Sequence, residues 1–270
     1  MNNKNYADIS VIIPCYNSYK TIERALNSVV NQSLLPREII LVDDCSTDKT
    51  LELLNNFKKN NLEYNIIILP LEKNVGAASA RNRAWDIAKY DFIAFLDSDD
   101  SWNYRKLEIQ YTFMVDNPHI IITGHDCEIL DNNSIIKNDD FEDKNFYNIT
   151  KYKLLFSNKY STPTIMLKRD IKFRFPENQR YAEDYYLWLE ILLSGGICYK
   201  SDLKLAYLYK AYYGESGLSS KLWDMEKGEL NNFKVMYKKK YINLFEFLVV
   251  YVFSFLKYLR RVVKVKLNGY

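Results

Sequence analysis

The first 110 residues alternate short apolar runs with segments whose apolar residues have helical spacing. The apolar runs lie at residues 9–14, 38–42, 65–69 and 92–96, and the helical segments between them at 21–32, 48–59 and 77–89. Continuous apolar strands separated by helices are typical of a parallel sheet covered on both faces. Ligands bind such sheets outside the carboxyl ends of the strands. Residues 14–17, 43–46 and 97–100 are therefore predicted to share one rim.

The length of the chain is enough for one large α/β domain, or for one domain with a smaller C-terminal appendage. The chain has 270 residues, of which 48% are hydrophobic and 26% charged, as in a folded globular protein. Its net charge of +3 is spread along most of the sequence and does not indicate nucleic acid binding. The N-terminus lacks an apolar signal segment, and the four cysteines form no C-x-x-C pair. We therefore expect a cytoplasmic protein with free thiols.

The second half of the chain is less regular. Helical patterns are present at residues 106–115 and 183–193, strand patterns within 120–136 and at 164–167, and loop compositions at 139–144 and 214–220. Gly195 and Gly196 are expected to end the second of these helices.

Residues 242–259 form an apolar stretch that is too short and too interrupted for a membrane-spanning helix. Its polar residues, at helical spacing, are Asn243, Glu246, Ser254 and Lys257, and the basic residues after them are Arg260, Arg261, Lys264 and Lys266. An apolar face with basic residues suits a helix lying on an anionic membrane surface, so peripheral contact through residues 241–266 is predicted. The alternative is a helix packed on the rest of the chain or in a dimer interface.

Two acidic clusters follow predicted strands. A carboxylate at Asp44 is able to accept a hydrogen bond from the N3–H of uracil, which cytosine lacks. Residues 44–48 also have the composition of a turn and a helix cap, and both interpretations can hold. Asp97, Asp99 and Asp100 would repel one another unless a cation lay among them. Carboxylates two residues apart suit Mg²⁺ or Mn²⁺ bridging to a diphosphate, although an acidic loop or cap is the alternative.

Two further segments carry weaker signals. Residues 74–82 combine a small-residue helix start with Arg81, which suits an anion, although small residues also allow tight packing of a helix on a sheet. Glu183 and Asp184 begin a predicted helix, where acids commonly cap or favour the helix dipole. A carboxylate held in a pocket there would also serve as a general base for an acceptor hydroxyl.

Taken in order, these segments resemble glycosyltransferase family 2. The matching segments are SVIIPCYN, IILVDDCSTDKT, NVGAASARNRA, FIAFLDSDD and AEDYYLWL. The resemblance is strong over residues 8–110 and looser to about 220. It implies the GT-A fold, an α/β, Rossmann-like, mostly parallel sheet flanked by helices, here with a C-terminal helical extension. The implied domains are a catalytic domain at 1–220, with a nucleotide-binding half at about 8–110 and an acceptor half at about 111–220, and a helical, basic-amphipathic extension at 221–270.

The resemblance also implies roles for single residues. Those expected at the nucleotide-sugar are Pro14, Tyr16, Asn17, Asp44, Asn74, Arg81, Asp97, Ser98 and Lys210. Asp99, with Asp97, would hold a divalent cation, Mn²⁺ or Mg²⁺, and Asp184 would be the catalytic base with Glu183 supporting it. Many relatives carry Arg and His in the late segment where this chain has Lys210 and no His.

The activity implied is inverting transfer of one hexosyl or N-acetylhexosaminyl group from a UDP-sugar to a glycan or lipid-linked oligosaccharide in surface polysaccharide biosynthesis. It would occur on the cytoplasmic face of the inner membrane, and a homodimer is compatible with the sequence. The Q-x-x-R-W motif and multiple spans of processive synthases are absent from the sequence. One alternative is a sugar-phosphate nucleotidyltransferase, although residues 14–17 are not its Gly-rich phosphate loop. The other is a non-catalytic nucleotide-sugar-binding protein, against which the presence of all the expected acids argues.

Overall fold

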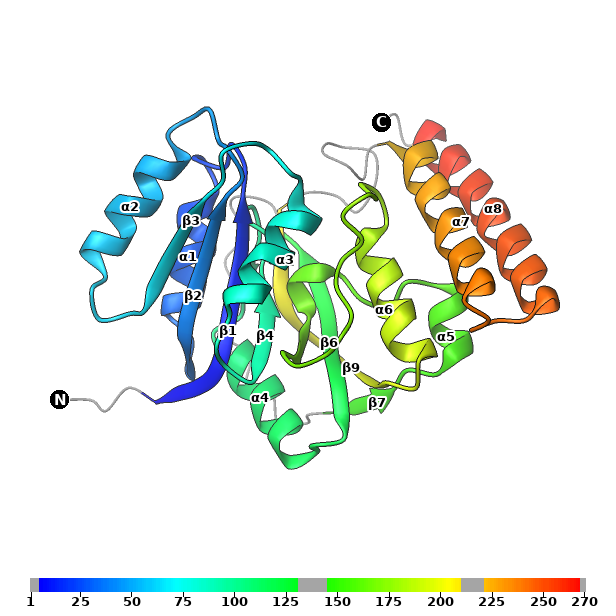
Figure 1. Cartoon of the computed structure of the whole chain (residues 1–270), viewed down its shortest axis with the longest axis horizontal. Coiled ribbons are helices and arrows are strands. Elements are labelled where there is room, and N and C mark those ends of the chain that lie inside the picture. Colours follow the sequence, from blue (N-terminus) through cyan, green and yellow to red (C-terminus); the bar gives the residue numbers. More distant parts are fainter. Residues whose placement is uncertain (1–4, 131–144, 210–220, 268–270) are drawn as a thin grey trace.

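Four parallel strands form the part of the sheet that the first 110 residues predict. They are β1 (Tyr6–Cys15), β2 (Leu35–Asp43), β3 (Ile66–Pro70) and β4 (Phe92–Phe95), in the order β3-β2-β1-β4. The connecting helices are α1 (Ile22–Val30), α2 (Thr50–Asn60) and α3 (Ala77–Ile87). The computed structural model in Figure 1 describes residues 5–130, 145–209 and 221–267.

Alternating side chains of these strands feed two apolar layers. Val11 and Ile13 pack with α1 and α2 on one face of the sheet, whereas Ile12 packs with α3 on the other. Successive side chains of a strand point to opposite faces, so a strand that is apolar throughout needs cover on both sides. The layers expected from the apolar runs are confirmed.

The second half of the chain extends this sheet with antiparallel and parallel neighbours. Its elements are β5 (Ser101–Trp102), α4 (Lys106–Asp116), β6 (Ile120–Ile129), β7 (Phe146–Asn148), α5 (Lys151–Phe156), a 3₁₀ turn at Thr162–Thr164, β8 (Met166–Lys168), α6 (Glu183–Leu193) and β9 (Ile197–Leu208). β8 lies antiparallel between β4 and β6, and β9 lies parallel to β6. The expected α/β fold with helices on both faces is confirmed, and its sheet is purely parallel only from β3 to β4.

Several elements differ from the sequence-based expectation. The sequence did not predict β5, β7, α5 or β9, because the first three are short and β9 mixes exposed and buried positions irregularly. In the described part of the region 120–136, which ends at residue 130, there is one strand, and it ends at Ile129. The loops expected at 139–144 and 214–220 lie outside the described residues. The division of the chain into domains near residue 220 stays a prediction.

Two antiparallel helices, α7 (Leu222–Lys238) and α8 (Leu244–Leu267), form the C-terminal end of the fold (Figure 1). Asn243 and Glu246 form a reciprocal capping box that begins α8: the Glu246 amide donates to Asn243 Oδ1 at 2.8 Å, and the Asn243 amide donates to Glu246 Oε2 at 2.9 Å. The C-terminal helical extension is thus confirmed. None of the described helices has the length and apolar character needed to cross a bilayer.

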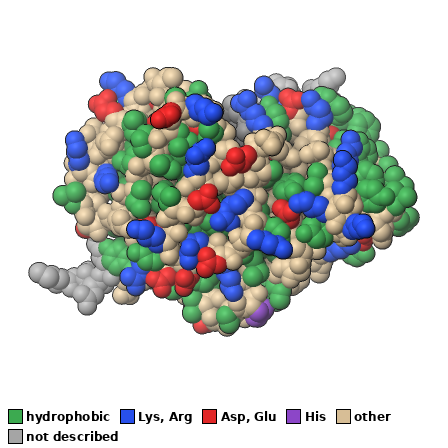
Figure 2. All heavy atoms as spheres, viewed as in Figure 1, with side chains coloured by type: hydrophobic (Ala, Val, Ile, Leu, Met, Phe, Trp, Pro, Cys, Tyr) green, Lys and Arg blue, Asp and Glu red, His purple; other side chains and the backbone are tan. Residues whose placement is uncertain are grey.

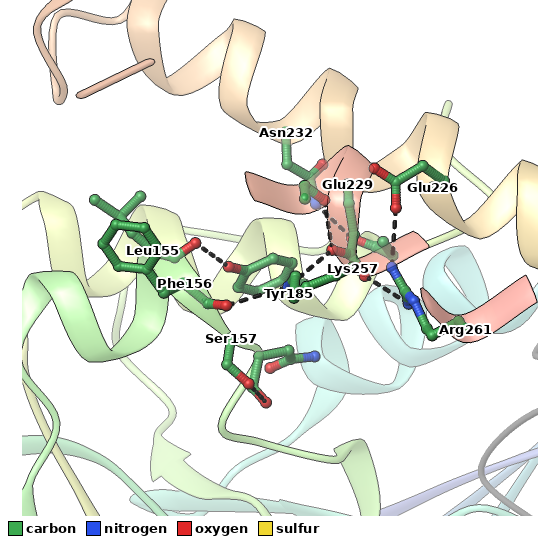
Figure 3. Close-up of polar contacts among 12 residues, drawn as sticks. Leu155, Phe156, Ser157, Tyr185, Glu226, Glu229, Asn232, Lys257 and Arg261 are labelled. Carbon is green, nitrogen blue, oxygen red and sulfur yellow. Dashed lines mark hydrogen bonds and ion pairs between the residues drawn. The ribbon is translucent and has the colours of Figure 1, made fainter. Parts of the chain in front are cut away.

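The contact between α7 and α8 is polar at its centre (Figure 3). Arg261 donates to Glu226 Oε2 at 2.9 Å and to Glu229 Oε1 at 3.2 Å. Ser254 donates to Glu229 Oε2 at 3.1 Å, and Lys257 Nζ lies 3.7 Å from the same oxygen. Glu226 is fully buried, and burial raises the pKa of its carboxyl. Polar residues at helical spacing in α8 therefore face α7.

We expect Arg261→Met to lower the free energy of unfolding by about 3 kcal/mol, the lower end of the range for breaking a buried ion pair, because part of the arginine still contacts solvent. The loss arises because the buried Glu226 loses its cation, while Glu229 keeps only the more distant Lys257 at 3.7 Å. Arg260→Met is the matched control, since Arg260 is exposed, and it should change stability by less than about 0.5 kcal/mol. Urea unfolding followed by circular dichroism measures both, and equal losses would contradict the role given to Arg261.

Candidate active site

The carboxyl ends of β1, β2 and β4 meet at a cavity of about 310 Å³, here called the rim cavity. Its lining residues are Pro14, Cys15, Tyr16, Asp44, Ala77, Arg81, Asp97, Ser98 and Asp99. Apart from Cys15 and Ala77, all of them are predicted site residues. The parallel strands bring them together because strands of one direction end at the same edge of the sheet.

Asp44 is fixed by the loop that precedes α3. Its Oδ1 accepts the Val75 amide at 2.7 Å and its Oδ2 accepts the Gly76 amide at 2.9 Å. Asn74 Nδ2 donates to the Asp44 carbonyl at 3.2 Å. Gly76, with φ of 84° and ψ of 160°, has a backbone conformation that is essentially restricted to glycine. The carboxylate is therefore held rigidly at the rim, and each oxygen still has a lone pair for another donor.

Arg81 joins the sheet rim to the beginning of α6. Its guanidinium lies 2.5 Å from Asp97 Oδ1 and 3.6 Å from Glu183 Oε1, and the residue is only 5% exposed. The neighbouring carboxylates raise its pKa against the opposing effect of burial. Two acidic motifs far apart in the sequence are thereby brought to one cation.

A second cavity of about 510 Å³, the loop cavity, shares Tyr16, Asp44 and Ala77 with the first. Its wall includes the predicted residues Asn74 and Glu183 and the unpredicted residues 177–180. Residues 177–180 could not be predicted, because this short polar segment has no apolar period and no recognisable motif. Asn82 holds this segment from α3: its side chain bonds the amide and the carbonyl of Phe175 at 3.0 and 2.8 Å.

Glu183 and Asp184 occupy the first turn of α6, as expected. Burial is the largest cause that raises the pKa of both carboxyls, to about 7 for Glu183 and about 6 for Asp184. The charge of Asp184 raises the pKa of Glu183 further, whereas Arg81 lowers both. The N-cap residue is Ala182, in a left-handed conformation with φ of 55°, and it makes no side-chain cap. The two acids thus lie in a low-dielectric environment, which brings their pKa values close to neutral pH.

The segment before these acids is held by α7, an element the sequence pattern did not predict individually. Asn232 donates to the Ala182 carbonyl at 2.9 Å and accepts from Gln179 Nε2 at 2.7 Å. Gly228 lets α7 approach closely, since a Cβ there would lie 2.3 Å from the Tyr181 carbonyl oxygen. The buried side of α7 thus mixes polar and small residues with the apolar Leu230, Phe233 and Met236, which interrupts its apolar period.

Asp97 and Asp99 are the predicted ligands of a divalent cation. Among the described residues, no three His, Cys, Asp or Glu side chains are grouped so that they could hold a metal ion. Mg²⁺ at phosphate sites commonly takes only one or two carboxylates and completes its coordination with substrate phosphates and water. Asp97 is already paired with Arg81, and Asp99 lies beside it on the rim. This donor set fits a cation that binds together with a diphosphate.

Three predicted site residues are placed differently from the others. One is Asp184, which directly follows Glu183 but lines neither cavity. Asn17 Oδ1 accepts from the Thr47 amide at 2.8 Å, so its side chain ties two rim loops together, and it lines neither cavity. Lys210 lies outside the described residues. The alternative interpretations of neighbouring motifs also hold: Asp48 bonds the amide of Thr50 at the beginning of α2, and Ala80 is fully buried where α3 packs on the sheet.

Comparison with known proteins gives consistent matches. The family model described as glycosyl transferase family 2 matches residues 10–174. Over 213 residues the chain is 35% identical to the UDP-Glc:alpha-D-GlcNAc-diphosphoundecaprenol beta-1,3-glucosyltransferase WfgD of Escherichia coli, covering 78% of this chain and 79% of the relative. It is 32% identical over 209 residues to the enzyme WfaP of the same description and organism, covering 76% and 78%.

A solved structure is similar over much of the fold. The crystal structure of S. aureus TarS 1-349 in complex with UDP-GlcNAc has a TM-score of 0.65 and 26% sequence identity to this chain. The match covers 83% of this chain and 66% of the TarS chain. The likeness therefore extends beyond the four parallel strands into the second half of the sheet.

We expect Gly228→Ala to lower the free energy of unfolding by about 1–2 kcal/mol, because overpacking costs typically 1–3 kcal/mol and alanine's better helix propensity offsets part of it. The added methyl group must push α7 away from Tyr181 and Ala182. Lys227→Ala, at the exposed neighbouring position, is the control and should stay within about 0.5 kcal/mol of the parent. Thermal and urea unfolding measure both variants. A stabilised Gly228→Ala protein would contradict the close approach.

Proposed function

This chain belongs to glycosyl transferase family 2, and we propose that it transfers one sugar, with inversion, from a UDP-sugar to a hydroxyl group of a lipid-linked saccharide. The contact that carries the proposal is the pairing of Arg81 with Asp97 and Glu183. Asp97 lies at the rim where the donor would bind, and Glu183 adjoins the acid proposed as the base. The buried side chain of Arg81 thus connects the proposed donor site with the proposed catalytic acids.

The rim cavity is the proposed donor site. Tyr16 is 52% exposed and offers a ring face on which a base can stack. The carboxylate of Asp44, held by two backbone amides, would accept the uracil N3–H. Two relatives are named for UDP-Glc and a similar structure contains UDP-GlcNAc, which supports a uridine donor with a hexosyl or N-acetylhexosaminyl group.

Asp99, with Asp97, is the proposed support for Mg²⁺ or Mn²⁺ held jointly by the donor's diphosphate. When bound, such a cation neutralises negative charge on the departing nucleotide diphosphate. Arg81 holds Asp97 in place, and Arg24 Nη2 donates to the Asp99 carbonyl at 2.6 Å, which fixes the turn that carries both carboxylates. A further contact of Lys210 with the diphosphate is also proposed.

Asp184 is the proposed general base. Its carboxylate would take the proton of the acceptor hydroxyl while that oxygen bonds to C1 of the donor sugar. The bond from C1 to the phosphate oxygen breaks on the opposite side, and its electron pair leaves with UDP, so the configuration at C1 inverts. A pKa of about 6 makes Asp184 more basic than an exposed aspartate and still largely ionised at neutral pH. Glu183, which lies 3.6 Å from Arg81, is given the supporting role.

The proposed acceptor is a saccharide carried on a lipid diphosphate. The names of WfgD and WfaP describe transfer to a GlcNAc-diphosphoundecaprenol, which supports this class. Acceptors of this kind are confined to a membrane, so we propose that the enzyme works at the cytoplasmic face of the inner membrane and contributes to surface polysaccharide. The absence of a Q-x-x-R-W motif in the sequence supports transfer of one sugar for each acceptor.

The direct test is a donor screen with UDP-glucose, UDP-galactose and their N-acetyl forms, with Mn²⁺, Mg²⁺ or EDTA and a synthetic lipid-diphosphate saccharide. We expect UDP release and transfer with at least one donor, and a loss in kcat of about 100- to 10,000-fold in Asp184→Asn, the range for removing a general base. Glu52→Gln, on the exposed side of α2, is the matched control and should retain parent activity.

Full activity of Asp184→Asn would refute the proposed base. Pyrophosphate release from UTP and a sugar phosphate would show a nucleotidyltransferase instead. Donor binding without transfer across a broad acceptor panel would favour a non-catalytic binding protein.

The rate should also depend on pH in a defined direction. Because burial raises the pKa of Asp184 to about 6 and of Glu183 to about 7, the acids are protonated below this window. A base must be ionised, so kcat/KM should fall as pH decreases through 7 to 6 and level off above it. Steady-state rates from pH 5 to 9 measure the profile. A flat profile down to about pH 4, the range of an unperturbed carboxyl, would contradict the buried acid pair.

A further inference from the structure

The side of α8 that faces away from the protein is apolar and uncovered. We call the α8 outer face the surface formed by Phe245, Leu248, Val252, Leu256, Leu259 and Val263, whose exposed fractions run from 44% for Leu259 to 75% for Phe245. Figure 2 shows hydrophobic side chains gathered along the edge of the molecule where Figure 1 places α8. Contiguous exposed apolar surface of this kind marks an interaction site more often than single exposed residues do.

The polar contacts on the other side of α8 prevent it from turning this face inward. Ser254, Lys257 and Arg261 all contact α7, and Glu229 accepts from or pairs with each of them. Rolling the helix to bury the α8 outer face would leave Glu229 and the fully buried Glu226 without cations, and unpaired buried charges are strongly destabilising. The exposed apolar surface is thus fixed by the fold.

Basic residues flank the α8 outer face at both ends. Arg260 and Lys264 are exposed near its C-terminal end, and Lys238 and Lys240 are exposed at the turn that leads into α8. The helix contains one acidic residue, Glu246, and its carboxylate pairs with Lys151. The outer side of α8 therefore carries positive charge and no carboxylate of its own.

We propose that the α8 outer face docks on an anionic lipid bilayer, with the helix lying in the plane of the interface. Its apolar side chains would enter the boundary between headgroups and acyl chains, and the flanking Lys and Arg residues would lie near lipid phosphates. A second copy of the chain is a poorer occupant. A two-fold interface apposes the same patch of both subunits, so the cations of α8 would meet a surface in which α8 supplies no carboxylate.

The proposal that the α8 outer face binds a bilayer is independent of the proposed function. The role of that binding in sugar transfer rests on the proposed function. α8 holds α7, and α7 bonds the segment that ends at Ala182, directly before Glu183 and Asp184. A helix seated on the bilayer would therefore hold the acid pair in a fixed orientation to the surface that carries a lipid-linked acceptor.

Vesicle flotation of the full chain tests the proposal. We expect the parent protein to float with vesicles of phosphatidylcholine and phosphatidylglycerol and to float less with phosphatidylcholine alone or in high salt. The double variant Leu248→Gln/Leu256→Gln should lose binding by about tenfold or more, since each leucine contributes substantial transfer free energy when buried. Leu62→Gln is the matched control, because Leu62 is 82% exposed on a loop far along the chain from α8 and should leave binding unchanged.

Charge reversal separates the electrostatic part of the interaction. Arg260→Glu/Lys264→Glu should remove the preference for anionic vesicles, whereas Lys58→Glu/Lys59→Glu, with the same charge change at exposed positions at the end of α2, should retain it. Circular dichroism confirms folding of every variant. Hydrolysis of a soluble UDP-sugar should be equal in all of them. If the parent protein floats but transfers no sugar, the proposed function is refuted and the proposed docking surface is not.

Two results would overturn the proposal. One is the absence of vesicle binding by the parent protein, or vesicle binding by the α8 double variant that equals that of the parent. The other is a dimer, measured by light scattering after gel filtration, that the α8 double variant dissociates while no protein floats with vesicles. The second result would assign the α8 outer face to another copy of the chain.

Discussion

The positive charge of Arg81 is the constraint on which the arrangement of the active site depends. Carboxylates from two distant segments, residues 97–99 and 183–184, converge on one side of the sheet, and like charges at such proximity repel one another. α3 inserts a guanidinium between the two segments and contacts both. A buried cation requires anionic partners as much as they require it. The β4 rim and the first turn of α6 are therefore held together through Arg81.

Buried polar contacts of α7 and α8 support the position of the acid pair. Asn232 bonds the backbone that carries Glu183, and Gly228 lets α7 approach to the required distance. α8 in turn neutralises the carboxylates of α7 through Arg261. Apolar packing alone would leave the helices free to shift or roll, whereas paired charges and hydrogen bonds specify one register. The acids are thus positioned by a chain of specific contacts that ends at the outermost helix.

The sequence predicted those parts of the fold whose signals are local. Continuous apolar runs identified β1 to β4, and the rule that strands of one direction end together brought Asp44 and Asp97 to one rim. The link between Arg81 and Glu183 could not be derived, because it depends on a contact between distant segments. α7 was not recognised individually since Glu226, Glu229 and Asn232 interrupt the apolar residues on its buried side. The amphipathic character of α8 was evident, but the side that faces the protein was not, because its polar partners lie on α7.

The polar seam between α7 and α8 also limits how this part of the molecule can change during evolution. Loss of Arg261 alone leaves Glu226 without its cation. Loss of Glu229 alone removes the acceptor of Ser254 and the ion-pair partner of Lys257. Substitutions that are each harmful alone become acceptable only when they occur in concert. A descendant that exchanged the seam for apolar residues would also lose the constraint on the roll of the helix. Drift along this pair of helices is therefore confined to compensated steps, while the exposed side can vary freely within its apolar and basic character.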